Sequence, residues 1–207
     1  MRADARANRE ALLAAARQLY AARGTSAPFS QIAAEAGVGI GTLYRHFPTP
    51  DDLIVGLLTD VLEQVTAICR RHRERLSGAD AAAAWRDVVD DLVALELGPL
   101  VPQLVADRAL ADLPSDLLDL RAEGLGEIER LLDLAKRAGL VRPDVTTLFF
   151  QAGLAAFSRP LPALLGDAAP GLRAWLVEVY LAGLRPTADD GAAVSLSSPA
   201  ARRSPRR

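Results

Sequence analysis

The sequence predicts an all-α fold. Long stretches rich in Ala, Leu, Arg and Glu run through the 207 residues, and these residue types are strong helix formers. Alternating runs of β-branched residues, which would indicate strands, are hard to find. Half of the chain is apolar but only 5% is aromatic, so the core must consist mainly of Ala, Leu and Val.

The first four helices can be placed from their apolar spacing and their ends. A helix over residues 6–23 ends at Gly24. Its predicted buried face consists of Leu12, Leu13, Ala16, Leu19 and Tyr20. Two short helices, over 30–36 and 40–47, flank the turn Gly37-Val38-Gly39, where Gly37 can adopt the left-handed conformation. A fourth helix begins at Pro50 with Thr49 as its cap and continues to about residue 75.

In the sequence after the fourth helix, we expect five further helices and a tail. The helices are expected over residues 80–97, 103–111, 115–138, 144–157 and 170–184. Pro99 and Pro102 force a break after the first of them. Residues 186–207 are rich in Ala, Ser, Pro and Arg, and we expect this basic tail to be disordered.

The helix over 40–47 has an outer face whose chemistry suits the major groove of DNA. Leu43 and Phe47 lie four residues apart and should point inward. The residues left outside are Gly41, Thr42, Tyr44, Arg45 and His46. Arg45 can donate to guanine or phosphate, and Thr42 can contact a thymine methyl group or a phosphate. The alternative is an ordinary helix pair whose polar residues face water.

The charge is distributed unevenly along the chain. Residues 1–47 contain six arginines and three acidic residues, a net charge of +3, although the whole chain carries −2. The tail from residue 186 carries +2, which leaves about −7 for the middle. A basic N-terminal region joined to an acidic body is expected when a DNA-binding domain is attached to another domain.

The N-terminal quarter resembles the tetracycline-repressor (TetR) family of bacterial transcription regulators. The residues that carry the resemblance are Ile32-Ala33, Ala36-Gly37-Val38 and Gly41-Thr42-Leu43-Tyr44-Arg45-His46-Phe47. A preceding helix that ends Leu19-Tyr20-Ala21-Ala22-Arg23-Gly24 and a following one that starts near Asp51-Asp52-Leu53 extend the match. The resemblance implies a three-helix DNA-binding domain over 1–50, a helical effector-binding and dimerisation domain over 51–185, and the tail over 186–207.

The same resemblance implies that residues 40–46 form the recognition helix. Gly41, Thr42 and Arg45 would then lie at or near base edges, and Tyr44 and His46 would contact phosphates. The full DNA-binding set is Ser30, Gly39, Ile40, Gly41, Thr42, Tyr44, Arg45 and His46. Ala27-Pro28 stands where many members have a capping Ser or Thr, and Pro48-Thr49-Pro50 stands where many have a lysine. One cap and one common backbone contact are therefore absent.

The last two helices are candidates for a dimer interface. Ala152, Gly153, Ala155 and Ala156 form a surface of small residues, and Leu172, Trp175, Leu176 and Val179 form an apolar stripe. From the residues alone, packing within one chain explains these features equally well. The resemblance favours the dimer, because family members pair these two helices in a four-helix bundle.

An effector pocket, implied by the resemblance, should lie between the fourth helix and the later ones. Its candidate wall residues are Trp85, Leu104, Phe149, Phe150 and Phe157. Aromatic residues at helical spacing also fit an ordinary core. Their apolar character favours a hydrophobic effector.

Other chemistry finds little support in the sequence. Gly37, Gly39 and Gly41 spell G-x-G-x-G, but no strand precedes them and no Gly-Lys-Ser/Thr follows. No catalytic set, metal site or cofactor is expected. His72 lies in an arginine-rich run that we expect to be a solvated helix end, and Glu127 and Glu129 are expected on an exposed helix face.

The single cysteine, Cys69, and the lack of a secretory signal favour a cytoplasmic location, and no membrane span is expected. We interpret the chain as a homodimeric repressor that binds a palindromic double-stranded DNA operator and is released by a small, apolar effector. Two other classes stay open. One is a helical small-molecule-binding protein whose motif no longer engages DNA, and the other is an α-helical enzyme with an unforeseen cofactor.

Overall fold

The structure, a computed structural model, describes residues 2–98, 100, 113–158, 168–169 and 171–186, and within them it confirms the all-α fold. The helices are α1 (Arg2–Arg23), α2 (Phe29–Glu35), α3 (Ile40–His46), α4 (Pro50–Leu76), α5 (Ala81–Ala94), α7 (Ser115–Arg137), α8 (Thr147–Phe157) and α10 (Leu172–Leu184). The helix expected over 103–111, with Leu104, lies outside the described residues, as do residues 187–207 of the tail.

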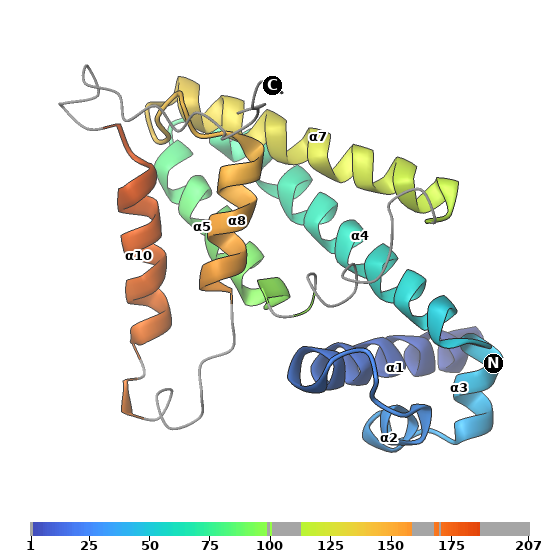
Figure 1. Cartoon of the computed structure of the whole chain (residues 1–207). Coiled ribbons are helices and arrows are strands. Elements are labelled where there is room, and N and C mark those ends of the chain that lie inside the picture. Colours follow the sequence, from blue (N-terminus) through green and yellow to red (C-terminus); the bar gives the residue numbers. More distant parts are fainter. Residues whose placement is uncertain (1, 99, 101–112, 159–167, 170, 187–207) are drawn as a thin grey trace, which may run out of the picture.

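Helices α1, α2 and α3 form a small head at one end of the molecule (Figure 1). Its core is built from apolar residues that the helical spacing predicts to be inside, among them Leu12, Tyr20, Ile32 and Leu43, all fully buried. Gly24 (φ 79°) ends α1 and Gly37 (φ 67°) ends the turn after α2, so both glycines adopt the left-handed conformation that other residues avoid.

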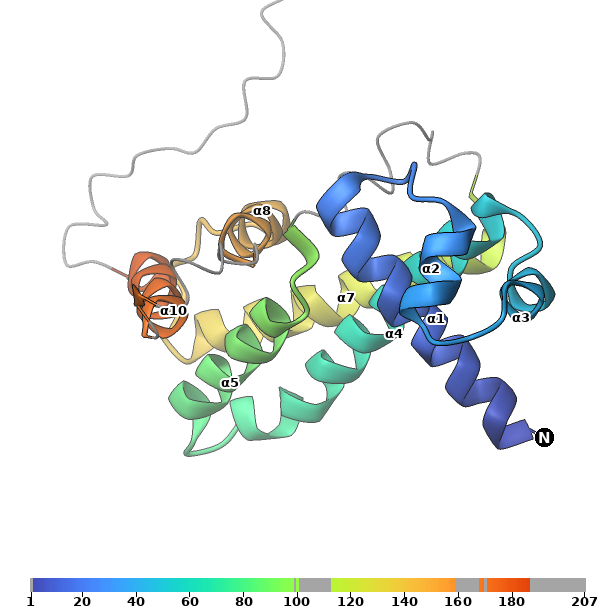
Figure 2. The same cartoon turned by 90° about the horizontal axis from the view of Figure 1, so that it is seen from below.

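Helix α4 connects the head to the body. Thr49 Oγ1 accepts a hydrogen bond from the Asp52 N–H (3.2 Å), and the Asp52 carboxylate accepts one from the Thr49 N–H (2.9 Å). This reciprocal pair, with Pro50 at the first helical position, fixes the start of α4 as the sequence predicts. In the body α4 lies along α7 on one side and α5 on another (Figures 1 and 2).

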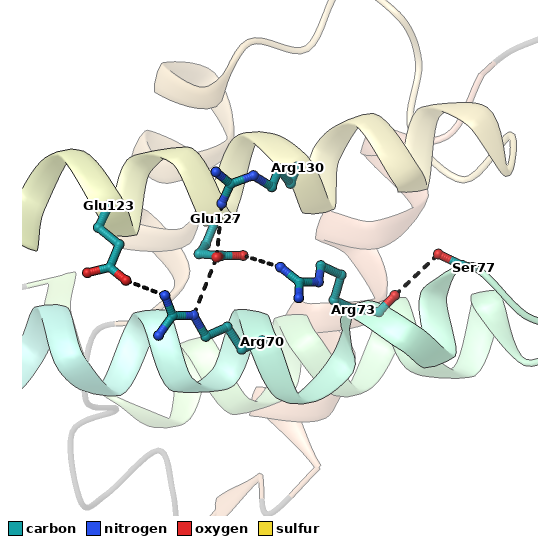
Figure 3. A network of polar contacts seen from close by, with 6 residues as sticks. All are labelled: Arg70, Arg73, Ser77, Glu123, Glu127 and Arg130. Atoms are coloured by element: carbon teal, nitrogen blue, oxygen red, sulfur yellow. Dashed lines mark hydrogen bonds and ion pairs between the residues drawn. The ribbon is translucent and has the colours of Figure 1, made fainter.

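A buried carboxylate joins α4 to α7 (Figure 3). Glu127 of α7 is only 3% exposed, and its oxygens lie 3.4 Å from Arg70 Nε, 3.2 Å from Arg73 Nη1 and 2.9 Å from Arg130 Nη1. Arg70 also pairs with Glu123. The expectation that Glu127 lies on an exposed face is therefore wrong, because α7 turns this residue toward two arginines of α4. Glu129 is exposed, as expected.

A second polar contact lies between α4 and α5. His72 is buried, and its Nε2 lies 2.8 Å from Oδ2 of Asp91, which also accepts from Arg71. The expectation of a solvated helix end at His72 is wrong, since α5 covers this side of α4. The end of α5 also differs: the helix ends at Ala94 because Glu96 has a φ of 52°, incompatible with a continued helix.

Candidate nucleic-acid interface

Helix α3 has one buried side and one open side. Leu43 and Phe47 are buried against the head, as their spacing predicts. Ile40 and Tyr44, also four residues apart, keep 44% and 53% of their surface exposed. Exposed apolar or aromatic side chains at consecutive turns of a short basic helix are typical of a surface that contacts another molecule.

On this open side, the packing and the backbone conformation do not explain why two positions, Gly39 and Gly41, are glycine. A Cβ built on Gly39 or Gly41 would meet no atom of the described part of the chain within 4 Å. Gly39 has an ordinary φ of −68°, so backbone strain does not require glycine there. Their lack of side chains instead leaves the backbone at the start of α3 bare, which would let an external surface approach it closely.

The exposed ring of Tyr44 is supported from α2. The ring of Phe29, the first residue of α2, lies 5.4 Å from it between centroids with an interplanar angle of 53°. This tilted geometry is favourable for aromatic pairs. Phe29 therefore restricts where the Tyr44 hydroxyl can lie. This role of Phe29 was not predicted, because its only signal in the sequence is an aromatic residue directly after Pro28.

Arg45 also has a defined position. Its Nε donates a hydrogen bond to the Gly41 carbonyl oxygen (3.1 Å), and its Nη2 donates one to Thr42 Oγ1 (3.1 Å). Arg45 is exposed and Thr42 half-buried, so this pair of contacts lies on the surface of the helix.

The remaining predicted DNA-binding residues surround this surface. Ser30 is exposed in the first turn of α2, and His46 is half-buried with its ring 6.3 Å from that of Phe47. Helix α2 has Pro28 as its N-cap and no side-chain cap, in line with the departure noted at Ala27-Pro28. Apart from Ser30, the predicted set lies on α3 or directly before it.

Contacts between the head and α4 fix the orientation of α3. The Phe47 ring lies against Gly56 of α4, and the Arg9 guanidinium lies 5.6 Å from the centre of the same ring. Arg17 of α1 pairs with Asp60 of α4, which also accepts a hydrogen bond from Gln64 (2.8 Å). Helical periodicity places Phe47 inside, but it does not mark any of these residues as a junction between the head and α4.

Comparisons with known proteins agree with this geometry. Residues 12–57 match the family of bacterial regulatory proteins, tetR family, and residues 77–186 match the SbtR-like transcriptional regulator C-terminal domain. The chain belongs to the TetR family of bacterial transcription regulators. The resemblance seen in the N-terminal quarter is thereby confirmed and extends over most of the chain.

Individual TetR-family proteins match along most of their length. The transcriptional repressor LfrR of Mycolicibacterium smegmatis is 33% identical over 142 residues, which cover 66% of this chain and 67% of LfrR. The crystal structure of LfrR in complex with proflavine has a TM-score of 0.62 at 28% identity, covering 86% of this chain and 94% of that one. A TetR protein from Mycobacterium vanbaalenii has a TM-score of 0.59 at 29% identity, covering 89% and 99%.

The TetR-family chain also has a set of exposed apolar side chains on α8 and α10, of which α10 lies on the side of the body away from the head (Figure 1). Its large members are Leu148 (73% exposed), Phe149 (44%), Trp175 (59%) and Val179 (43%). Of the other residues predicted for a dimer interface, Ala156 is exposed, whereas Leu172 and Leu176 are half-buried. Leu148 was missed, although it precedes Ala152 and Ala156 at a spacing of four.

Gly153, predicted for the dimer interface, also has a packing role within the chain. A Cβ at this position would lie 2.5 Å from the Tyr180 ring, so the small size of Gly153 is needed for α10 to pack on α8 within one chain. The Tyr180 hydroxyl donates a hydrogen bond to the Phe150 carbonyl oxygen (2.7 Å), which fixes the same packing.

The residues predicted for an effector pocket do not all lie together. Trp85 and Phe150 are buried with ring centroids 5.3 Å apart, and Tyr180 extends this cluster to Phe150 at 6.1 Å and to Phe157 at 5.2 Å. Phe149 is separate, since it belongs to the exposed surface of α8. The Trp85 Nε1–H is buried and has no hydrogen-bond partner among the residues that the structure describes.

The described residues contain neither a metal-ion cluster nor a membrane-spanning helix. No three His, Cys, Asp or Glu side chains there are grouped so that they could hold a metal ion. None of the described helices has the length and apolar character needed to cross a membrane.

Proposed function

We propose that this TetR-family chain is a repressor that acts in the cytoplasm as a homodimer, binds a palindromic DNA operator through α3 of each copy, and is released by a small apolar effector. The observation that carries the proposal is the open side of α3. Tyr44 and Arg45 are exposed there, each supported by a neighbouring side chain, beside two glycines whose backbone is bare. This combination suits the major groove, where arginine reads base edges and hydroxyl groups contact phosphates.

The dimer is supported by the apolar surface of α8 and α10. Leu148, Phe149, Trp175 and Val179 are large apolar side chains exposed on two helices that pack together, and extensive apolar exposure of this kind often serves an interface. A second copy seated on the same surface would bury it in a two-fold symmetric arrangement. Two recognition helices could then read half-sites about 34–36 Å apart, one turn of the duplex.

The effector is proposed to bind in the body, near the aromatic cluster of Trp85, Phe150, Phe157 and Tyr180. Support comes from the apolar, aromatic character of this cluster and from LfrR, a relative whose structure contains proflavine. Leu104 stays a candidate wall residue. To change operator occupancy from 99:1 to 1:99, an effector must prefer the released state by about 5.5 kcal/mol.

Selection of bound DNA from a random-sequence pool tests the proposal directly. We expect the full-length protein to recover an inverted repeat whose half-sites lie one helical turn apart. Arg45→Ala should relax the base preference at one position of each half-site. Recovery of no preferred sequence, together with equal binding of wild type and Arg45→Ala, would refute the assignment of α3 as a recognition helix.

A further inference from the structure

The side chain of Arg45 is held by hydrogen bonds to its own helix. Its two acceptors, the Gly41 carbonyl oxygen and Thr42 Oγ1, belong to residues four and three positions earlier, and both lie 3.1 Å from the donating nitrogens. Residues at these spacings lie on the same side of an α-helix. Arg45 therefore lies along the outside of α3 in a position defined by two hydrogen bonds.

These two contacts use only one edge of the guanidinium group. Arginine has five N–H donors in a planar fork. The Nε–H and one Nη2–H point to the same side, and this is the edge that Gly41 and Thr42 occupy. The outer edge, with one N–H from Nη1 and one from Nη2 pointing in parallel, is left for an external acceptor pair.

We propose that Thr42 acts in DNA recognition by positioning Arg45, so that the outer edge of the guanidinium reads a guanine. A parallel pair of N–H donors matches the O6 and N7 acceptors that guanine presents in the major groove. A side chain that is already fixed loses less rotational freedom on binding than a mobile one. The family resemblance leads to the expectation that Thr42 contacts DNA itself, whereas in this proposal Thr42 is a positioning residue. The inference rests on the function proposed above.

Two substitutions at position 42 separate the hydroxyl group from the shape of the side chain. Thr42→Val removes the acceptor but keeps the branched shape, whereas Thr42→Ser keeps the acceptor. On the duplex that wild type recovers from the random pool, we expect Thr42→Val to weaken binding about 3- to 10-fold. We expect Thr42→Ser to stay within about twofold of wild type, since the hydroxyl still accepts from Arg45.

A double-mutant cycle tests whether Thr42 acts through Arg45. In the Arg45→Ala background, Thr42→Val should cause no further loss of affinity for the same duplex, because the partner of the hydroxyl is gone. Replacing single guanines by 7-deazaguanine, which lacks the N7 acceptor, should weaken wild type at one position of each half-site. The same replacement should have a smaller effect on Thr42→Val and none on Arg45→Ala.

Several results would overturn the inference. Equal losses from Thr42→Val with and without Arg45 would show that Thr42 contacts DNA directly. A loss from Thr42→Val without any sensitivity to 7-deazaguanine would assign Arg45 to phosphate and not to guanine. An unchanged affinity of Thr42→Val for the selected duplex would refute the positioning role while the proposed function stands. If wild type selects no sequence, the proposed function fails and the inference fails with it.

Discussion

The ring of Phe47 fills the space that a side chain at position 56 would need: a Cβ built on Gly56 would lie 2.7 Å from Phe47 Cε1. Phe47 directly follows α3, and Gly56 lies in the second turn of α4. Because the ring is buried, it has little room to move away. The contact therefore links the orientation of α3 to that of α4.

We predict that Gly56→Ala destabilises the protein by about 1–3 kcal/mol, because overpacking at the Phe47 ring exceeds the gain of up to about 1 kcal/mol in helix propensity. Denaturant unfolding of the full-length protein measures this change. Gly126→Ala is the matched control, since a Cβ there would meet only Arg130 at 3.8 Å. Phe47→Leu should relieve part of the loss in Gly56→Ala. Equal stability of the two glycine variants would contradict the close packing.

We predict that Tyr44→Phe weakens DNA binding about 2- to 10-fold, the effect of losing one hydrogen bond to phosphate. The loss should be similar for the selected duplex and for mixed-sequence DNA, because phosphate contacts carry no sequence information. Phe29→Leu should reduce DNA affinity less than Tyr44→Phe does, because it only removes the support on one side of the Tyr44 ring. In the Tyr44→Ala background, Phe29→Leu should cause no further loss of affinity. Fluorescence anisotropy with labelled duplexes gives these affinities. A loss from Tyr44→Phe confined to one sequence would instead place Tyr44 on a base.

We predict that Trp175→Glu converts a dimer, twice the 22.0 kDa mass of the chain, to a monomer. A charge buried at the centre of an apolar interface without a partner is costly, so association should weaken strongly. Light scattering at micromolar concentration measures the mass. Leu148→Glu should act in the same way, whereas Ala83→Glu, at an exposed position of α5, should not. A wild-type protein of 22.0 kDa would disprove the proposed interface.

We predict that Cys69 does not react with a thiol reagent at pH 8 until the protein unfolds. Burial, with a smaller effect of Glu127, raises the pKa of the Cys69 thiol to about 12. The folded protein therefore keeps this proton at pH values where the unfolded chain, with a pKa of about 8.5, has lost it. Ionisation of Cys69 in the unfolded chain therefore lowers the free energy of unfolding as the pH rises above about 8.5. Rapid labelling at the rate of a small free thiol would show that Cys69 is accessible.

We predict that Glu127→Ala lowers the free energy of unfolding by about 1–3 kcal/mol, because hydrogen bonds to charged groups between α4 and α7 are lost. The loss of stability is limited because the three arginine partners are each about half-exposed, so water can hydrate them once the carboxylate is removed. Glu129→Ala, two residues along α7 and exposed, is the control and should change stability by less than about 0.5 kcal/mol. If Glu127→Ala and Glu129→Ala lowered the free energy of unfolding equally, the buried position of Glu127 would contribute nothing to stability.

Local signals were sufficient to predict the head. Gly24, Gly37 and the cap at Thr49 act within a few residues, so the C-terminal ends of α1 and α2 and the start of α4 could be placed from the sequence, whereas α1 starts at Arg2 and not near residue 6. The inward positions of Leu43 and Phe47 followed from their spacing, and with them the outer face of α3. The resemblance to the TetR family rests on these same residues.

Contacts between distant segments could not be predicted in this way. Glu127 is buried because Arg70 and Arg73 of α4 approach it from another helix, and no spacing within α7 shows that. His72 is buried for the same reason, by α5. The role of Gly153 depends on where Tyr180 of α10 lies, so small size alone could not show whether the neighbour is the same chain or a second copy.

The unbroken length of α4 has a mechanical consequence. Its 27 residues make a rod about 40 Å long, with one end at the junction with Phe47 and the other between α5 and α7. A tilt of about 5° at one end of such a lever displaces the other end by about 3.5 Å, close to the roughly 3.4 Å rise between successive base pairs. A rearrangement of side chains in the body, too small to disturb its core, would thus move the head end of α4 by about the rise of one base pair.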